Sequence, residues 1–214
     1  MTARHRFAFV TAAMTWFALA VQLNLTVGRA PPGVEGIVTE IGKFFGYFTI
    51  LTNLMVATVM TAIACGNGRP LTAWHEQPRV AGALVIYSTI MLLVYEVMLR
   101  GLWHPAGIEW LADLLLHDAI PVACLTYFIA FVPRGGLRWQ DPVVWLVYPV
   151  TYSIYAFVRG ALTNWYPYPF VDVNALGVLP ALRNATFVIL AFCVVGLLFV
   201  AADRALARAR PVRD

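Results

Sequence analysis

The chain has 214 residues, of which 61% are hydrophobic and only 12% are charged, and its formal net charge is +4. A soluble domain usually has about 25% charged residues, so a chain with half that share cannot cover a surface that faces water. This composition excludes a soluble globular enzyme, a disordered tail and a coiled coil, and it predicts an all-α integral membrane protein.

Six apolar stretches follow one another along the chain. A helix that crosses a membrane needs about 20 mostly apolar residues, and we expect each stretch to be a transmembrane helix of a single domain over residues 1–214. The first is too long for the apolar core of a signal peptide, and no clean cleavage site follows it, so we expect it to be retained. In chain order the stretches are residues 7–27, 44–65, 80–99, 110–132, 143–159 and 184–202.

Basic residues are divided unequally between the loops that join these stretches. With the N-terminus in the cytoplasm, ten basic residues lie on the cytoplasmic side and five on the other side. Short cytoplasmic loops are richer in Lys and Arg, so we expect six spans in the cell membrane with both termini cytoplasmic. The cytoplasmic set is Arg4, Arg6, Arg69, Arg79, Arg134, Arg138, Arg204, Arg208, Arg210 and Arg213. The opposite set is Arg29, Lys43, Arg100, Arg159 and Arg183.

This orientation places the segment 165–170, Trp-Tyr-Pro-Tyr-Pro-Phe, at the outer interface of the membrane. Amphipathic aromatic rings are favoured at that depth. The two prolines of the segment exclude a regular α-helix there.

Polar residues within the spans gather in the outer third of the membrane. Thr49, Thr52 and Asn53 share one face of the second span, and Asp113 and His117 share one face of the fourth, because residues three or four apart are neighbours on a helix. The inner halves of the spans carry almost no polar residues, so we expect a polar cavity that opens toward the outer leaflet. Further members of this set are Asn24, Glu96, Arg100, Tyr148, Tyr152, Tyr155, Arg159, Arg183 and Asn184.

Most of these residues also have a purely structural interpretation. Threonines in membrane helices often bond their own backbone carbonyls, and Glu96 with Arg100 is typical of an ion pair at a helix end. His117 favours a function, because a histidine at this depth, one turn after Asp113, is costly without a role. Asp118 is the poorer partner for it, since adjacent residues on a helix point about 100° apart.

The set contains the groups that a hydrolase with a hydroxyl nucleophile needs. Such a nucleophile requires a base within hydrogen-bond reach, and the base benefits from an orienting carboxylate. Thr49, His117 and Asp113 supply these types, and we expect Thr49 to face His117 at ~3–6 Å. Asp113 is one candidate for the other ring nitrogen of His117, with Glu96 and Tyr152 as alternatives from other helices. Unranked donors to a developing oxyanion are Asn53, Tyr152, Arg159 and Asn164.

Three segments resemble, in the same order, segments of the animal androgen-induced membrane proteins. They are residues 43–54 (KFFGYFTILTNL), 114–128 (LLLHDAIPVACLTYF) and 157–173 (FVRGALTNWYPYPFVDV). Proteins of that family are six-span hydrolases of fatty acid esters of hydroxy fatty acids, and they use a threonine and a histidine. The resemblance implies that Thr49 is the nucleophile and His117 the catalytic histidine. Thr52 is the alternative nucleophile, because the first segment also aligns on it.

The chain departs from the animal proteins at two of these positions. Asp118 stands where they have threonine, and Arg159 stands where they have histidine. With 14 arginines and one lysine, the composition is typical of a bacterial relative, whose substrate need not be the animal one.

We therefore expect a hydrolase of lipid esters that works on membrane lipids and binds no nucleic acid. No cofactor and no metal are expected, because the histidines and cysteines lack the spacing of metal ligands. The alternative is a membrane protein that binds or transports a lipid or small molecule without chemistry. Transporters usually have polar groups near the midplane and broken helices in repeated halves, so transport ranks lower. The oligomeric state stays open.

Overall fold

The structure is a computed structural model that describes residues 1–66, 74–102 and 104–209, and within these ranges every regular element is a helix. The chain divides into two compact units, Met1–Pro133 and Arg134–Asp214. Arg69, Arg210 and Arg213, three of the residues that support the predicted orientation, lie outside the described residues.

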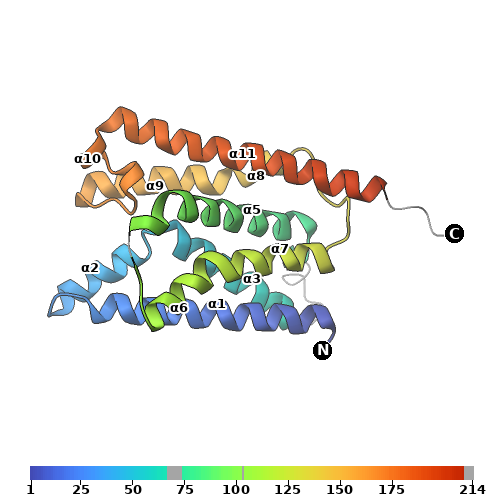
Figure 1. Ribbon diagram of the computed structural model, residues 1–214, viewed down its shortest axis with the longest axis horizontal. Coiled ribbons are helices and arrows are strands. Elements are labelled where there is room, and N and C mark those ends of the chain that lie inside the picture. Colours follow the sequence, from blue (N-terminus) through green and yellow to red (C-terminus); the bar gives the residue numbers. More distant parts are fainter. Residues whose placement is uncertain (67–73, 103, 210–214) are drawn as a thin grey trace. The chain divides into compact units, whose positions relative to one another are not determined.

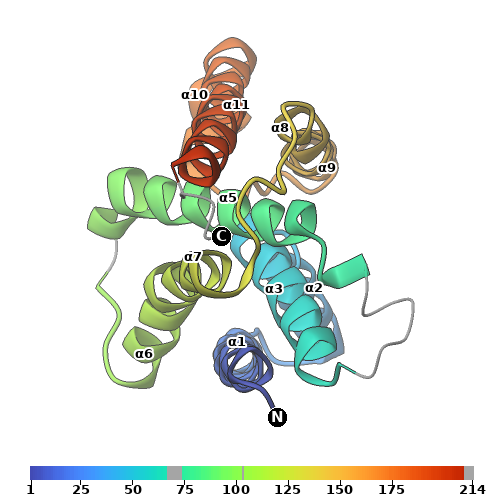
Figure 2. The same ribbon diagram turned by 90° about the vertical axis from the view of Figure 1, so that its right-hand side faces the viewer.

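The first unit is a bundle in which α1 packs against α3, α6 and α7, and α5 packs against α3 and α7. Figure 2 shows α1 nearly end-on, with α3, α6 and α7 beside it. Two of the long helices contain a π-helical turn, η1 after α5 and η3 between α6 and α7. The elements, of which Figure 1 labels the α-helices, are α1 (Ala3–Gly28), α2 (Val34–Phe44), α3 (Phe48–Ala64), α5 (Pro78–Val94), η1 (Tyr95–Leu99), η2 (Arg100–Leu102), α6 (Ile108–Leu114), η3 (Leu115–Ala119) and α7 (Ile120–Phe131).

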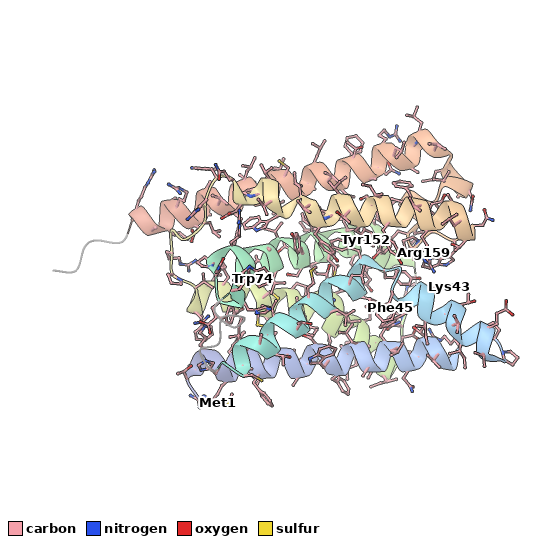
Figure 3. The ribbon with its side chains drawn as sticks, turned by 180° about the vertical axis from the view of Figure 1, so that it is seen from behind. Met1, Lys43, Phe45, Trp74, Tyr152 and Arg159 are labelled. Carbon is pink, nitrogen blue, oxygen red and sulfur yellow. The ribbon has the colours of Figure 1, made fainter. Side chains whose placement is uncertain are left out.

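A sharp bend between α2 and α3 decides where the second predicted span begins. The axes of the two helices differ by 74°, and Figure 3 labels Phe45 at the bend. Tyr47 is extended, with φ −84° and ψ 132°, so a new helix starts at Phe48. The bend therefore places Thr49 in the first turn of α3, next to the positive end of that helix.

Small side chains allow α1 to lie close to its neighbours. Ala8, Ala12 and Ala18 are buried on the side of α1 that faces the bundle, as is usual where membrane helices approach closely. The hydroxyl groups of the buried Thr11 and Thr15 donate to the backbone carbonyls four residues earlier, at 3.0 and 2.7 Å. Those bonds satisfy both hydroxyls without a partner from another helix.

The second unit begins with two helices, α8 (Asp141–Trp145) and α9 (Val147–Thr163). A single 3₁₀ turn, η4 (Pro169–Val171), and a short helix, α10 (Val173–Leu176), lead into the long α11 (Val178–Arg208). The predicted absence of a regular α-helix over 165–170 is confirmed, because only η4 reaches into that segment.

A close contact between two segments of the second unit explains why residue 160 is a glycine. A Cβ on Gly160 of α9 would clash with Cε1 of Tyr166, so only glycine fits against this ring. The residue that ends α9, Asn164, has a φ of 54°, a left-handed conformation that asparagine tolerates better than most residues.

Four of the described helices are long and apolar enough to cross a membrane, or five if the bent pair α2 and α3 is one span. Large apolar side chains such as Phe187 and Leu198 of α11 are 62% and 64% exposed, which is unfavourable in water and typical of a surface that faces lipid. The prediction of an all-α membrane protein is thereby confirmed. The four helices are Ala3–Gly28, Pro78–Leu102, Ile108–Phe131 and Val178–Arg208.

The predicted span at 143–159 corresponds to α8 and α9. The longer of the two, α9, has 17 residues, which is at the lower end of the range for a membrane helix. Six spans with cytoplasmic termini therefore stay a prediction.

Candidate active site

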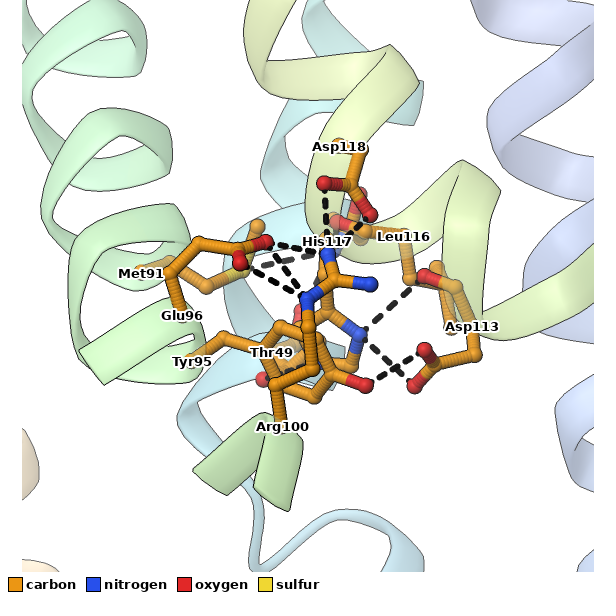
Figure 4. A network of polar contacts seen from close by, with 10 residues as sticks. Thr49, Met91, Tyr95, Glu96, Arg100, Asp113, Leu116, His117 and Asp118 are labelled. Atoms are coloured by element: carbon orange, nitrogen blue, oxygen red, sulfur yellow. Dashed lines mark hydrogen bonds and ion pairs between the residues drawn. The ribbon is translucent and has the colours of Figure 1, made fainter. Parts of the chain in front are cut away.

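The hydroxyl group of Thr49 and the imidazole of His117 lie together in the first unit (Figure 4). Thr49 Oγ1 is 3.3 Å from His117 Nε2, although the residues are 68 positions apart in the chain. Thr49 is buried, and the side chain of His117 is only 14% exposed. The prediction that these two side chains face each other is confirmed.

Asp113 holds the other nitrogen of the same imidazole. His117 Nδ1 is 3.1 Å from Asp113 Oδ1 and 3.2 Å from the backbone oxygen of Asp113. A carbonyl oxygen only accepts hydrogen bonds, so Nδ1 donates to the backbone oxygen of Asp113, and the carboxylate oxygen lies close beside it. A neutral imidazole with its proton on Nδ1 would present the lone pair of Nε2 to the Thr49 hydroxyl, which is the arrangement that a general base requires. Among the partners that the sequence left open, the structure shows Asp113.

Tyr95 joins this network, although the sequence did not single it out. Its hydroxyl donates to Asp113 Oδ2 at 2.5 Å. Its ring stacks on the imidazole of His117, with centroids 3.8 Å apart and planes 10° apart. A tyrosine buried in a membrane span needs a hydrogen-bond partner, and that requirement is the signal in the sequence that identifies it.

Arg100 forms a second link between the helix that carries Tyr95 and the helix that carries His117. Its Nη2 donates to both carboxylate oxygens of Asp118, at 2.7 and 2.8 Å, and its Nε donates to Glu96. The guanidinium carbon lies 4.9 Å from the centre of the Tyr95 ring. The ion pair between Glu96 and Arg100 is confirmed, and Asp118 binds Arg100 while Asp113 orients His117.

Asn53 lies one turn after Thr49 in α3 and is completely buried. Its Nδ2 donates to the backbone oxygens of Thr49 and Leu116, at 2.9 and 3.4 Å. A side-chain amide has two N–H hydrogens, and those of Asn53 are directed at these two carbonyls and at Met91 Sδ, 3.6 Å away, inside the protein. Asn53 thus ties α3 to η3. Thr52 is also completely buried, and the contact with His117 is made by Thr49.

Both helices that carry the network widen at the site. Tyr95 begins the π-helical turn η1, and His117 and Asp118 lie in η3. Such turns are rare in proteins, and those that do occur frequently lie at functional sites. Pro121 follows η3 and lacks the N–H that would bind the carbonyl of His117 in a regular α-helix, which gives the widened turn a physical cause.

Three further candidates lie in the second unit. Arg159 has its guanidinium carbon 4.5 Å from the Trp165 ring centre, and the Tyr152 ring is 6.2 Å from that of Tyr155. The backbone oxygen of Asn164 accepts a hydrogen bond from Asn174 at 3.2 Å. Their assignment as oxyanion donors stays a prediction.

Not every residue expected in a polar cavity belongs to the network. Asn24 is exposed on α1, and Arg183 is exposed on α11. Among the described residues, no three His, Cys, Asp or Glu side chains are grouped so that they could hold a metal ion.

Comparisons of the chain with models of protein families, with curated proteins and with solved structures found no match.

Proposed function

We propose that this chain is an integral membrane hydrolase of lipid esters, with Thr49 as the nucleophile and His117 as the base. The observation that carries the proposal is the unbroken series of contacts from the Thr49 hydroxyl through the imidazole to the Asp113 carboxylate. Hydrolytic triads are recognised by this geometry and by the roles of their members, whatever their order in the chain. The resemblance of the three segments to a threonine hydrolase family supports the same assignment.

The position of Thr49 in the first turn of α3 also favours this chemistry. The first turn of a helix carries partial positive charge, which stabilises negative charge as it develops on the hydroxyl oxygen and on a nearby carbonyl oxygen. Because Thr49 is buried, little water competes with that interaction.

The reaction follows from these contacts in two halves. In the first, the Thr49 oxygen gives its proton to His117 Nε2 and attacks the ester carbonyl carbon, whose oxygen becomes an oxyanion. As the oxyanion collapses, the bond to the alcohol oxygen breaks and Nε2 protonates that oxygen. In the second half, Nε2 takes a proton from water, and the hydroxide oxygen attacks the carbonyl carbon of the acyl-threonine. The bond between that carbon and the Thr49 oxygen then breaks, and the proton on Nε2 returns to the Thr49 oxygen. Ester and water thus yield alcohol and acid, and both side chains are restored.

The proposed orientation gives this site access to both reactants. With six spans in the cell membrane and both termini in the cytoplasm, Thr49 and His117 lie in the outer third of the membrane. A lipid ester enters laterally from the outer leaflet, and water enters from outside.

Hydrolysis by the purified protein in detergent micelles tests the proposal. A panel of fatty acid esters, including an ester of a hydroxy fatty acid, should be cleaved by the wild type. Thr49→Ala and His117→Ala should each lower kcat by roughly 10³-fold or more, and the double variant should lose little beyond that, because the two groups act as one unit.

Thr52→Ala is the matched control, since it removes the same hydroxyl from the same helix one turn later. It should reduce kcat much less than Thr49→Ala. A wild type that cleaves no ester and reacts with no fluorophosphonate probe would contradict the hydrolase assignment. A lipid that binds beside His117 without turnover would then favour the binding protein.

A further inference from the structure

Tyr95 holds two members of the site at once. Its ring covers one face of the His117 imidazole, and its hydroxyl donates to the carboxylate oxygen of Asp113 that does not face the imidazole. The side chain is 3% exposed, so the contacts are shielded from competing water. Figure 4 shows the tyrosine side chain among the groups of the network.

We infer that Tyr95 is a positioning residue that fixes the orientation and the protonated nitrogen of His117. This inference rests on the proposed function, in which His117 Nε2 must keep a free lone pair toward Thr49. Tyr95 lies in the third predicted span, and neither the chemistry of the triad nor the resemblance to known hydrolases assigns a role to it.

The two contacts constrain different motions. Stacking at 3.8 Å restricts rotation of the imidazole about its bond to Cβ, because a turned ring would clash with the tyrosine. The hydrogen bond to Oδ2 restricts rotation of the Asp113 carboxylate, so that Oδ1 stays beside His117 Nδ1. Without the hydroxyl, the carboxylate turns more freely and the proton is held less strictly on Nδ1.

The surrounding structure keeps Tyr95 in place. The ion pair between Arg100 and Asp118 connects the turn that follows Tyr95 with the π-helical turn that carries His117. The Arg100 guanidinium also lies over the Tyr95 ring, an arrangement that is attractive between a cation and an aromatic face. Tyr95 is thus held by a residue that is itself fixed to the helix of His117.

Tyr95→Phe separates the two contacts, because phenylalanine retains the stacking and loses the hydrogen bond. Loss of a hydrogen bond to a charged group can change a rate roughly 10- to 100-fold. We therefore expect kcat to fall at least about tenfold and KM to stay within about twofold. In the Asp113→Asn background the same change should have little further effect, because both substitutions act through one carboxylate.

The matched control is Tyr127→Phe. Tyr127 is also buried in the first unit, and its hydroxyl accepts a hydrogen bond from the charged Arg4 at 2.8 Å. Removal of the Tyr127 hydroxyl should lower the stability of the protein without lowering kcat. A structural role for Tyr95 would make the two variants behave alike.

Nitrogen NMR of histidine-labelled protein tests the inference without any need for turnover. In the wild type and in Tyr127→Phe, the His117 signals, assigned by their loss in His117→Gln, should show the proton on Nδ1 alone. In Tyr95→Phe they should show a mixture of both neutral forms. Unchanged His117 signals and an unchanged kcat in Tyr95→Phe would overturn the inference. Absence of ester hydrolysis by the wild type would instead overturn the proposed function and leave the NMR result standing.

Discussion

Replacing Asp113 by asparagine isolates the role of the carboxylate with almost no change of shape. In the protein, His117 Nδ1 lies 3.1 Å from Asp113 Oδ1, and Tyr95 donates to Oδ2. An asparagine keeps one oxygen for the Tyr95 hydroxyl and turns its NH₂ group toward Nδ1. Since that group donates, it favours the neutral imidazole with its proton on Nε2, where it blocks the transfer from Thr49.

The expected loss in kcat is up to roughly 10⁴-fold, the size of the loss when the carboxylate of a serine-protease triad is changed to an amide. The assay is steady-state hydrolysis of a soluble ester by protein in micelles, with the thermal midpoint Tm measured in parallel. Asp118→Asn is the matched control: it removes a neighbouring carboxylate that binds Arg100, and it should reduce kcat far less. Equal kcat values for Asp113→Asn and the wild type would refute the assigned role of Asp113.

Three further outcomes are expected. Asn53→Ala leaves two buried carbonyls without their shared donor and should destabilise the protein by about 2–3 kcal/mol, measured by unfolding in mixed micelles; an unchanged stability would contradict its linking role. Gly160→Ala places a methyl group against the Tyr166 ring and should cost about 1–3 kcal/mol, whereas a neutral result would mean that the ring moves freely. A C-terminal tag should be protected from protease in intact cells, and its digestion there would reverse the proposed orientation.

The class of protein and the main contact of the site follow from the sequence because both depend on simple periodicities. Long apolar stretches predict membrane helices whatever their packing. Spacing of four residues places Asp113 and His117 on one helix face, and the structure shows the two side chains in contact. Polar groups at one depth of a membrane form contacts with one another, because the lipid offers them no other hydrogen-bond partner. The approach of Thr49 to His117 was predictable for that reason.

Other parts of the site depend on local geometry that periodicity does not contain. The π-helical turns at Tyr95 and His117 insert extra backbone into regular helices, and no spacing rule anticipates which faces they turn toward each other. For this reason the sequence does not identify Tyr95 as a site residue. Its neighbour Glu96 is also the more conspicuous polar residue in a membrane span. The bend before Thr49 likewise depends on the extended backbone of one residue, Tyr47.

The most direct test of the central claim is to locate the atom that reacts. The purified wild type is treated with a fluorophosphonate that carries an alkyl chain, and the modified residue is identified by peptide mass spectrometry. The assignment predicts a single adduct on Thr49, which is lost in Thr49→Ala and forms far more slowly in His117→Ala. An adduct on Thr52 or on any other residue, or adduct formation at an unchanged rate in His117→Ala, would contradict it.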